Sequence, residues 1–487
     1  MNFEKSTIAS IAALFAASIA AATPVVSNVR MVQPIGSRYV TITYRLSEDA
    51  IVTLDVLTNA TPHAETGWAS IGGEAVSTAQ GAVWRKVTSA DATDGTYSIK
   101  WRPIDSWKDE NGNCLNVDDG CAKAVLTAWS LDNPPNYMVV DISTGARPNT
   151  QRYFPAVEFL PGAEPGQRGA ITNNPVYKTS MLVMRKIPAK GVTWTAGSLA
   201  SETSRHQYGR ENTRHVTLSS NYYMAVFETT QAQWDLIQTA RLAPSYFSNG
   251  AYRDYRPVEQ VCYNEIRMQA NNTGANENSE EWPGRPYPGS FLALLSDKTG
   301  IDFDLPTEAQ WEFAARAGHG SPYWGDGSNI WSMHNDGNLN LLGRYALNGG
   351  WVDSGNDIPE GTAAPAAGAG TSRGTAWVGS YKPNSWGLYD MHGNVFEWCI
   401  DWFRDVLSTE NGYVDDGTGT PIPVEYNTQN NKRAIRGGSF GGTDRGDARN
   451  YFGRSGNCRP AWRQYRSPGS RENFIGFRVV CPADFTN

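Results

Sequence analysis

Residues 387–403 read GLYDMHGNVFEWCIDWF, a mixture of glycines, carboxylates and aromatic rings that neither a helical nor a strand period explains. Gly393 and Asn394 predict a tight turn, because both residue types tolerate a positive φ. The apolar residues that follow, 395–402, predict a buried strand. The stretch is therefore expected to place a sharp turn at the start of a core strand.

Two carboxylates flank this turn, Asp390 before it and Glu397 after it. Carboxylate oxygens, together with carbonyl oxygens of a turn, are the ligands that Ca²⁺ takes in proteins. The residues alone leave two interpretations open. One is a calcium site, and the other is a structural turn packed among core aromatics.

The composition limits the class of protein. A chain of 487 residues is too long for one ordinary core and predicts two or three domains. Its net charge of -7 argues against a nucleic-acid partner, which would require a basic face. The 48 glycines and 17 tryptophans predict a protein rich in loops and held together by aromatic packing.

The N-terminus predicts export. Lys5 precedes an apolar run over residues 8–19, and three alanines at 20–22 offer a cleavage site, as in a signal peptide. The run is too short to span a bilayer, and nothing later in the sequence reaches that length. We expect a signal peptide over residues 1–22, a secreted or periplasmic protein and no membrane insertion of the mature chain.

The chain has six cysteines, an even number that favours disulfides in an oxidising compartment. Cys114 and Cys121 are expected to close a small local loop. Spacing alone does not pair the other four (Cys262, Cys399, Cys458 and Cys481).

Residues 24–150 predict an all-β domain. Several segments alternate apolar and polar residues or are rich in strand formers between turn-like clusters, which is typical of an immunoglobulin-like or fibronectin-like β-sandwich. The segments are 40–46, 51–57, 95–103 and 121–131. Residues 151–176 are rich in Pro and Gly and predict a linker.

The remaining residues, 177–487, predict short helices among loops. Thr230 with Gln233, and Thr307 with Gln310, form capping boxes, and Gly318 is expected to end the second helix. A dense set of arginines lies near the C-terminus, interleaved with aromatic residues. A solvated surface and a ligand-binding surface are both compatible with it. Its members are Arg436, Arg449, Arg454, Arg459, Arg463, Arg466 and Arg471.

Five motifs in this part occur in an order that resembles the formylglycine-generating enzyme, or sulfatase-modifying factor, family. They are PVEQVCYNE, LPTEAQWEFAARAG, GLYDMHGNVFEW, RGGSF and IGFRV, within residues 177–483. The resemblance implies an α+β, loop-rich fold related to C-type lectins. It also implies an enzyme that oxidises a sulfatase cysteine to formylglycine with copper held by two cysteines.

The cysteine pair of that family has no counterpart here. Counting from Ser439 as the family spacing requires gives Gly442 and Asp447, and counting back from Arg463 gives Tyr451 or Arg454, with Ser455 as the partner. Copper(I) requires soft thiolates. We therefore expect no copper and assign no catalytic residue.

The resemblance further implies a calcium site and a cysteine pairing. The calcium ligands would be Asp390, the carbonyls of Gly393 and Val395, and Glu397. Relatives that carry EWC with NCR imply that Cys399 pairs with Cys458, which leaves Cys262 with Cys481.

We derive two main hypotheses. The first is a calcium-stabilised, exported binding or scaffolding module for a peptide, a glycan or a partner protein outside the cytoplasm. Its ligand-binding residues would be Arg436, Ser439, Gly442, Asp447, Arg449, Tyr451 and Arg463. The alternative is an oxidoreductase that converts a sulfatase cysteine to formylglycine. A surface or matrix component assembled through the β-sandwich is a third possibility.

Overall fold

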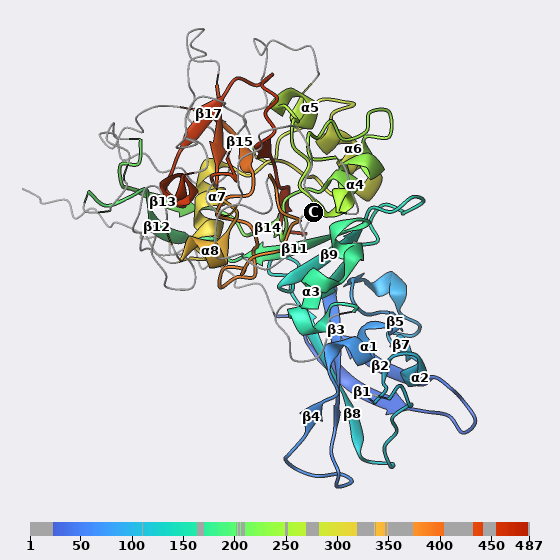
Figure 1. The fold of residues 1–487 in the computed structure, drawn as a ribbon. Helices are drawn as coiled ribbons and strands as arrows, with labels where there is room; N and C mark the ends of the chain where they lie inside the picture. The colour runs from blue at the N-terminus through green and yellow to red at the C-terminus, as the bar shows by residue number, and fades with distance from the viewer. Residues whose placement is uncertain are drawn as a thin grey trace, which may run out of the picture.

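The computed structural model describes residues 23–109, 111–162, 170–200, 202, 205, 210–248, 252–268, 282–318, 336, 338–345, 348, 374–403, 432–441 and 454–485. The expected signal peptide lies outside these residues. Figure 1 shows the N-terminal strands, in blue and cyan, as one group beside the larger C-terminal part of the chain. Within the described residues, no helix combines the length and apolar character needed to cross a bilayer.

The N-terminal part consists of two β-sheets around one hydrophobic cluster. The predicted strands over 40–46 and 51–57 are confirmed, and their alternate residues Ile42 and Leu54 are both buried in that cluster. One sheet has the order β1 (Val26–Val32), β2 (Val40–Leu46), β7 (Tyr97–Trp101) and β5 (Gln80–Gly81). The other contains β4 (Ala69–Ser70), β3 (Ala50–Thr58), β6 (Lys86–Val87) and β8 (Ala122–Trp129). The immunoglobulin-like sandwich stays a prediction.

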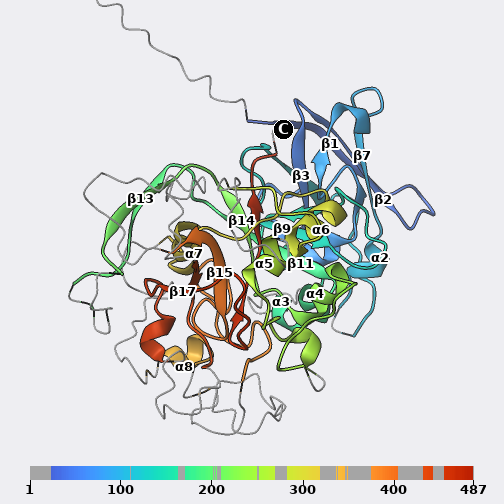
Figure 2. The same ribbon diagram turned by 90° about the horizontal axis from the view of Figure 1, so that it is seen from above.

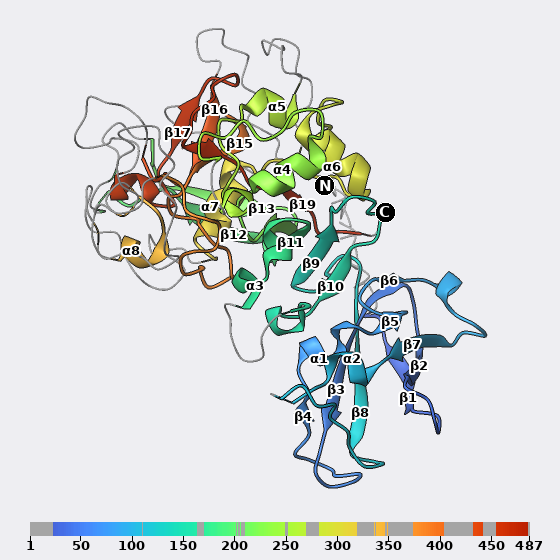
Figure 3. The same ribbon diagram turned by 45° about the vertical axis from the view of Figure 1, so that its right-hand side comes forward.

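A third sheet connects the two parts of the chain. Its order is β10 (Arg152–Phe154), β9 (Tyr137–Asp141), β11 (Met181–Ile187), β14 (Tyr222–Ala225) and β19 (Val480–Pro482). Strand β9, which precedes the predicted boundary at residue 150, and strand β14, which follows it, thus both pair with β11. Phe485, near the C-terminus, packs on Tyr153 with ring centroids 5.6 Å apart, at the place where Figure 3 shows the chain end beside β9 and β10.

The C-terminal part combines short helices with small sheets and many loops. Helices α4 (Gln231–Ile237), α5 (Tyr263–Arg267) and α6 (Phe291–Thr299) lie together, away from the hairpin of β12 (Val192–Ala196) and β13 (Arg214–Leu218), as Figure 2 shows. A further sheet has the order β17 (Gln464–Arg466), β16 (Arg433–Arg436), β15 (Phe396–Trp402) and β18 (Ile475–Gly476). The other helices are α1 (Gly73–Ser77), α2 (Pro103–Ser106), α3 (Ala170–Asn173), α7 (Glu308–Ala315) and α8 (Leu339–Leu342).

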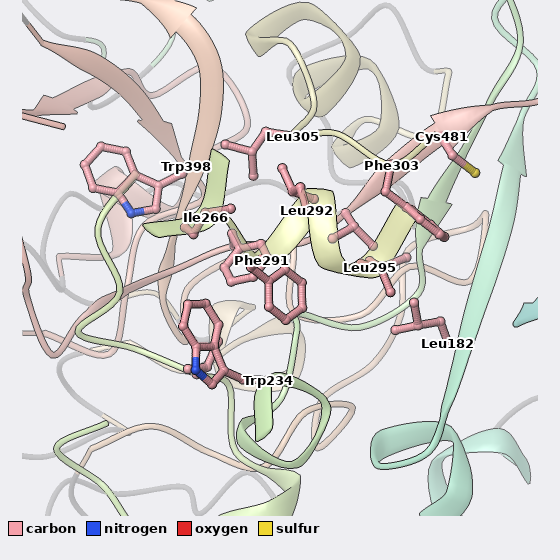
Figure 4. Packing of buried hydrophobic residues seen from close by; sticks show 14 of the residues in the cluster. Leu182, Trp234, Ile266, Phe291, Leu292, Leu295, Phe303, Leu305, Trp398 and Cys481 are labelled. Atoms are coloured by element: carbon pink, nitrogen blue, oxygen red, sulfur yellow. The ribbon is translucent and has the colours of Figure 1, made fainter. Parts of the chain in front are cut away.

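Aromatic side chains fill the core of this part, as the tryptophan content predicts. Trp234 of α4 stacks on Phe291 of α6 with ring centroids 5.0 Å apart, and Figure 4 shows Phe291 between Trp234 and the two leucines Leu292 and Leu295 of α6. The two capping boxes are confirmed, at the N-termini of α4 and α7. The strand predicted over 395–402 is confirmed as β15.

The expected disulfides are wrong for this structure, in which all six cysteines are free thiols. The backbone of Cys114 forms an isolated antiparallel β-bridge with that of Lys108, whereas the carbonyl of Cys121 accepts a hydrogen bond from the Asn59 N–H. The two cysteines therefore have different neighbours. The other four thiols also lie apart. Cys399 and Cys458 belong to different hydrophobic clusters, and Cys262 begins α5, whereas Cys481 lies on β19. The spacing of the cysteines along the sequence does not predict which residues surround each thiol in the folded chain.

Candidate functional site

The predicted turn is confirmed, with left-handed backbone at three positions: φ is 59° at Asp390, 104° at Gly393 and 60° at Asn394. The Gly393 N–H donates to the carbonyl of Gly437 at 2.7 Å, and the Asn394 N–H donates to the carbonyl of Arg344 at 2.7 Å. The turn is therefore held between two segments distant in sequence.

Glu397, the carboxylate after the turn, is neutralised by an arginine. Its two oxygens accept hydrogen bonds from Arg478, both at 2.7 Å, and Oε2 also accepts one from the indole of Trp311 at 2.7 Å. Glu397 and Arg478 are both fully buried. Arg478 also donates to the carbonyls of Ala225 and Tyr389, which connects the turn to β14.

Two further carboxylates lie in the same buried region. Glu228 accepts hydrogen bonds from the Asn394 side chain at 2.6 Å and from the Val395 N–H at 3.2 Å. Burial raises the pKa of Glu228 well above its usual value, and the nearby Asp390 and Glu397 raise it further. We call Glu228, Asp390 and Glu397 the acidic cluster.

Asp390 carries an unused acceptor in this cluster. Its Oδ2 accepts a hydrogen bond from the Gly379 N–H at 2.7 Å, whereas its buried Oδ1 has no hydrogen-bond partner among the described residues. Burial raises the pKa of Asp390 to about 6, against the opposing effects of the Gly379 N–H, Arg478 and Lys178. A cation placed at Oδ1 would satisfy it.

The four predicted calcium ligands fit this geometry only in part. Asp390 offers a free buried oxygen, as a hard cation requires. Glu397 does not, because Arg478 and Trp311 occupy both of its oxygens. Among the described residues, no three His, Cys, Asp or Glu side chains are placed to share a metal ion. Calcium stays a prediction, with Asp390 as the best-placed of its ligands.

Two of the predicted ligand-binding arginines are buried in ion pairs. Arg436 donates to Glu312 at 2.6 Å, and Arg463 donates to Glu308 at 2.6 Å. Glu308 and Glu312 lie one turn apart on α7, and Glu312 also pairs with Arg316 at 2.8 Å. These arginines join β16 and the segment before β17 to α7, so the solvated surface considered from the sequence is wrong at these two buried positions, whereas their ligand-binding role stays a prediction.

The remaining predicted ligand-binding residues divide into two groups. Ser439 is fully buried, and its hydroxyl donates to the Gly441 carbonyl at 3.1 Å. The others lie outside the described residues, and their role stays a prediction. They are Gly442, Asp447, Arg449 and Tyr451.

One thiol, Cys458, lies against the RGGSF motif. A Cβ added at Gly438 would lie 2.6 Å from its Sγ, so this position requires glycine. Its carbonyl lies 3.1 Å from the Nδ1 of His392. Burial raises the pKa of Cys458 to about 12, so the thiol is protonated at neutral pH. Burial lowers the pKa of His392 to about 3, so the imidazole is neutral.

Several charged residues of this region were not predicted from the sequence. Glu308 and Glu312 lie in the motif LPTEAQWEFAARAG, which predicts only a helix at these positions, and Arg478 lies in the motif IGFRV, which assigns it no partner. Glu228 precedes the capping box at Thr230, and no local sequence motif indicates its role. Its contacts with the turn are made to Asn394 and Val395, which lie more than 160 positions away. Only the packing reveals the acidic cluster.

Comparisons with known proteins agree with the resemblance. Residues 183–483 match the family profile described as sulfatase-modifying factor enzyme 1-like domain. The formylglycine-generating enzyme of Streptomyces coelicolor is 35% identical over 188 residues, which cover 38% of this chain and 48% of that enzyme. The chaperone protein LppX of Paenibacillus barcinonensis is 29% identical over 229 residues, which cover 44% of this chain and 72% of that protein.

The chain thus spans about half the length of the Streptomyces enzyme. Among solved structures, PvdO from Pseudomonas aeruginosa superposes with a TM-score of 0.41 at 23% identity, over 62% of this chain and 94% of that one.

Proposed function

The chain belongs to the family with the sulfatase-modifying factor enzyme 1-like domain, and from this premise we propose that it is an exported binding or scaffolding module. Its ligand would be a partner protein, a peptide or a glycan outside the cytoplasm. The alternative function is the oxidation of a sulfatase cysteine to formylglycine. Relatives whose names carry that activity support the alternative, whereas LppX, named a chaperone protein, supports the binding role.

The observation that carries the proposal is the state of the thiol next to the RGGSF motif. From residue 400 to residue 480 the sequence holds one cysteine, Cys458. It is fully buried against Gly438, and its high pKa keeps it protonated. Copper(I) in the family chemistry requires two thiolates, because thiolate sulfur is the ligand of choice for this soft ion. A single buried thiol does not supply them.

The buried ion pairs support the same reading. Arg436 and Arg463 connect β16 and the segment before β17 to α7, and we propose that they stabilise the scaffold instead of contacting the ligand. We propose that recognition falls to the segment between Gly441 and Arg454, which includes Asp447, Arg449 and Tyr451. The N-terminal β-sheets, proposed to form an immunoglobulin-like sandwich, would position this domain.

The first prediction concerns catalysis. We expect the purified protein to leave a cysteine-containing sulfatase peptide unchanged when supplied with Cu(I) and oxygen, because a pair of copper-binding thiolates is lacking. Mass spectrometry of the peptide measures the result. The Streptomyces formylglycine-generating enzyme serves as the positive control. Formylglycine produced by this chain, and abolished by Cys458→Ser, would establish the alternative function.

The second prediction concerns the ligand surface. The triple variant Asp447→Ala, Arg449→Ala and Tyr451→Ala should recover about tenfold less of its partner in quantitative cross-linking with exported proteins and glycans, since a few residues dominate most interfaces. The matched control replaces exposed Asp118, Arg30 and Tyr39 of the N-terminal part with alanine. Equal recovery by the triple variant and wild type would remove this segment from the proposed surface.

The third prediction concerns calcium. A cation bound at Asp390 would relieve its unpaired buried charge, so Ca²⁺ should stabilise the protein by about 2.7 kcal/mol at a free concentration one hundred times its Kd. Thermal unfolding in Ca²⁺, in Mg²⁺ and in a chelator measures the effect. Asp390→Asn should reduce the response to Ca²⁺. Identical unfolding of the wild type in Ca²⁺ and in the chelator would remove calcium from the proposal.

A further inference from the structure

A cavity of about 480 Å³ opens in the N-terminal part, remote in sequence from the RGGSF region. Its walls come from β3, the start of α1, the end of α2 and the short 3₁₀ turn over Val157–Phe159. A volume between about 300 and 1,000 Å³ is typical of small-molecule sites. The cavity is therefore large enough for one amino-acid-sized ligand.

The walls are held in place by contacts that leave little freedom. A Cβ added at Gly73 would lie 2.2 Å from the Cα of Phe159, so α1 and the 3₁₀ turn approach as closely as glycine allows. The carbonyl of Ala75 accepts hydrogen bonds from the Trp101 indole at 2.8 Å and from the Ser106 hydroxyl at 2.6 Å. These bonds connect α1 to both β7 and α2.

The lining carries excess negative charge. Asp55, Glu74 and Glu158 line the cavity with one lysine, Lys108. The Ser70 hydroxyl donates to Asp55 at 2.8 Å, but within the described residues no ion pair involves Asp55 or Glu158. Partial burial raises the pKa of Asp55, opposed by hydrogen bonds from Ser70 and the Val56 N–H, and no cation contributes. Within the part of the chain that the structure describes, Asp55 and Glu158 therefore have no positive partner.

Two aromatic side chains, Trp107 and Phe159, line the cavity together with the apolar Ile71 and Ala75. Trp107 lies against Trp101, with ring centroids 6.2 Å apart, which anchors it to the core of the β-sheets. The face of an aromatic ring attracts a positive charge and also packs against methylene groups. Carboxylates combined with ring faces favour a ligand that has a cationic end and an apolar stem.

We propose that this cavity binds a small organic cation, a guanidinium or primary ammonium group on a short apolar stem, of the kind carried by arginine and lysine. Asp55 and Glu158 hold the cationic group, while Trp107 and Phe159 pack against the stem. The site is independent of the function proposed for the C-terminal part. A neutral sugar would bury the same rings but would leave the carboxylates unpaired.

Isothermal titration of the full chain with L-arginine and with L-citrulline tests the proposal. The two ligands match in shape and differ in the charge of the terminal group. Arginine should bind at least about tenfold more tightly than citrulline, because a hydrogen bond to a charged group contributes more than a neutral one. Lysine and glucose, titrated in parallel, test the ammonium group and the sugar.

Variants assign the binding to the cavity. Asp55→Asn and Glu158→Gln keep the shape of the side chain and should each weaken arginine binding about tenfold. Glu65→Gln, an exposed residue that does not line the cavity, should leave it unchanged. Equal binding of arginine and citrulline, tighter binding of glucose, no measurable binding of any cation, or binding insensitive to both variants would each overturn the proposal.

Discussion

Replacing Glu312 with glutamine is expected to lower the free energy of unfolding by about 3–5 kcal/mol, because it leaves two buried arginines without their counter-ion. Glu312 is fully buried and accepts hydrogen bonds from Arg316, from Arg436 and from the Gly197 N–H. Glutamine keeps the volume but removes the charge and offers one acceptor oxygen in place of two. Thermal unfolding of a domain of about 300 residues, whose unfolding entropy is roughly 0.6 kcal/mol/K, should shift down by roughly 5–8 °C.

An exposed pair provides the control. Glu472 lies 3.9 Å from Arg466 and its side chain is 41% exposed, so solvent screens the interaction. Glu472→Gln should change the free energy of unfolding by less than about 0.5 kcal/mol. If Glu312→Gln proved no more destabilising than Glu472→Gln, the ion pairs on α7 would not hold this part of the fold together.

The same residue predicts a pH dependence. Arg316 and Arg436 lower the pKa of Glu312 from its ordinary value of 4.5 to about 2, although burial acts in the opposite direction. A carboxylate with a depressed folded pKa binds fewer protons in the folded state, so its contribution to stability is complete above pH 4.5 and is lost as the pH falls toward 2. The difference in stability between wild type and Glu312→Gln should therefore shrink across this range in urea titrations.

Replacing Gly393 with alanine is expected to cost about 2–6 kcal/mol and to prevent folding if the protein is marginally stable. The added Cβ would lie 2.1 Å from the carbonyl oxygen of Arg344, and φ at this position is 104°, which L side chains rarely adopt. Neither the turn nor the Arg344 segment can move freely, because the Asn394 N–H bonds that same carbonyl. Chemical denaturation measures the loss.

Alanine substitutions at two other glycines distinguish the cost of backbone strain from the cost of a steric clash. Gly289 has φ of 86° and nothing within 4 Å of a built Cβ, so Gly289→Ala should cost only the backbone strain, about 1–3 kcal/mol. Gly469 has open space and no positive φ, so Gly469→Ala should be close to neutral. A Gly393→Ala variant no less stable than Gly289→Ala would show that the Arg344 carbonyl yields to the new methyl group.

Calcium and protons would act on the same acidic cluster. The positive charge of Arg478 compensates the negative charge of Glu397. The pKa values of Glu228 and Asp390 are raised, because burial disfavours their charged forms. A bound cation would lower both pKa values, which makes the response to Ca²⁺ depend on pH. The calcium prediction is therefore best measured above pH 6, where Asp390 is ionised.

The local features of this fold were readable in the sequence. The turn at Gly393 and Asn394 follows from residue types that accept a positive φ, and the helix starts at Thr230 and Thr307 follow from side chains that bond backbone groups within three residues. The order of five motifs identified the family, which the profile match over residues 183–483 supports. Each signal lies within a short segment.

The partners of the charged residues were decided only by the tertiary structure. Arg436, a candidate for a surface or ligand contact from the sequence, meets Glu312 across 124 positions, and Arg478, to which the sequence assigned no partner, meets Glu397 across 81. The six thiols, an even set by count, stay unpaired because packing puts them beside different neighbours. A turn or cap is encoded by residues within a few positions of one another, whereas a buried charge or thiol acquires its partner from whichever distant segment the folded core brings beside it.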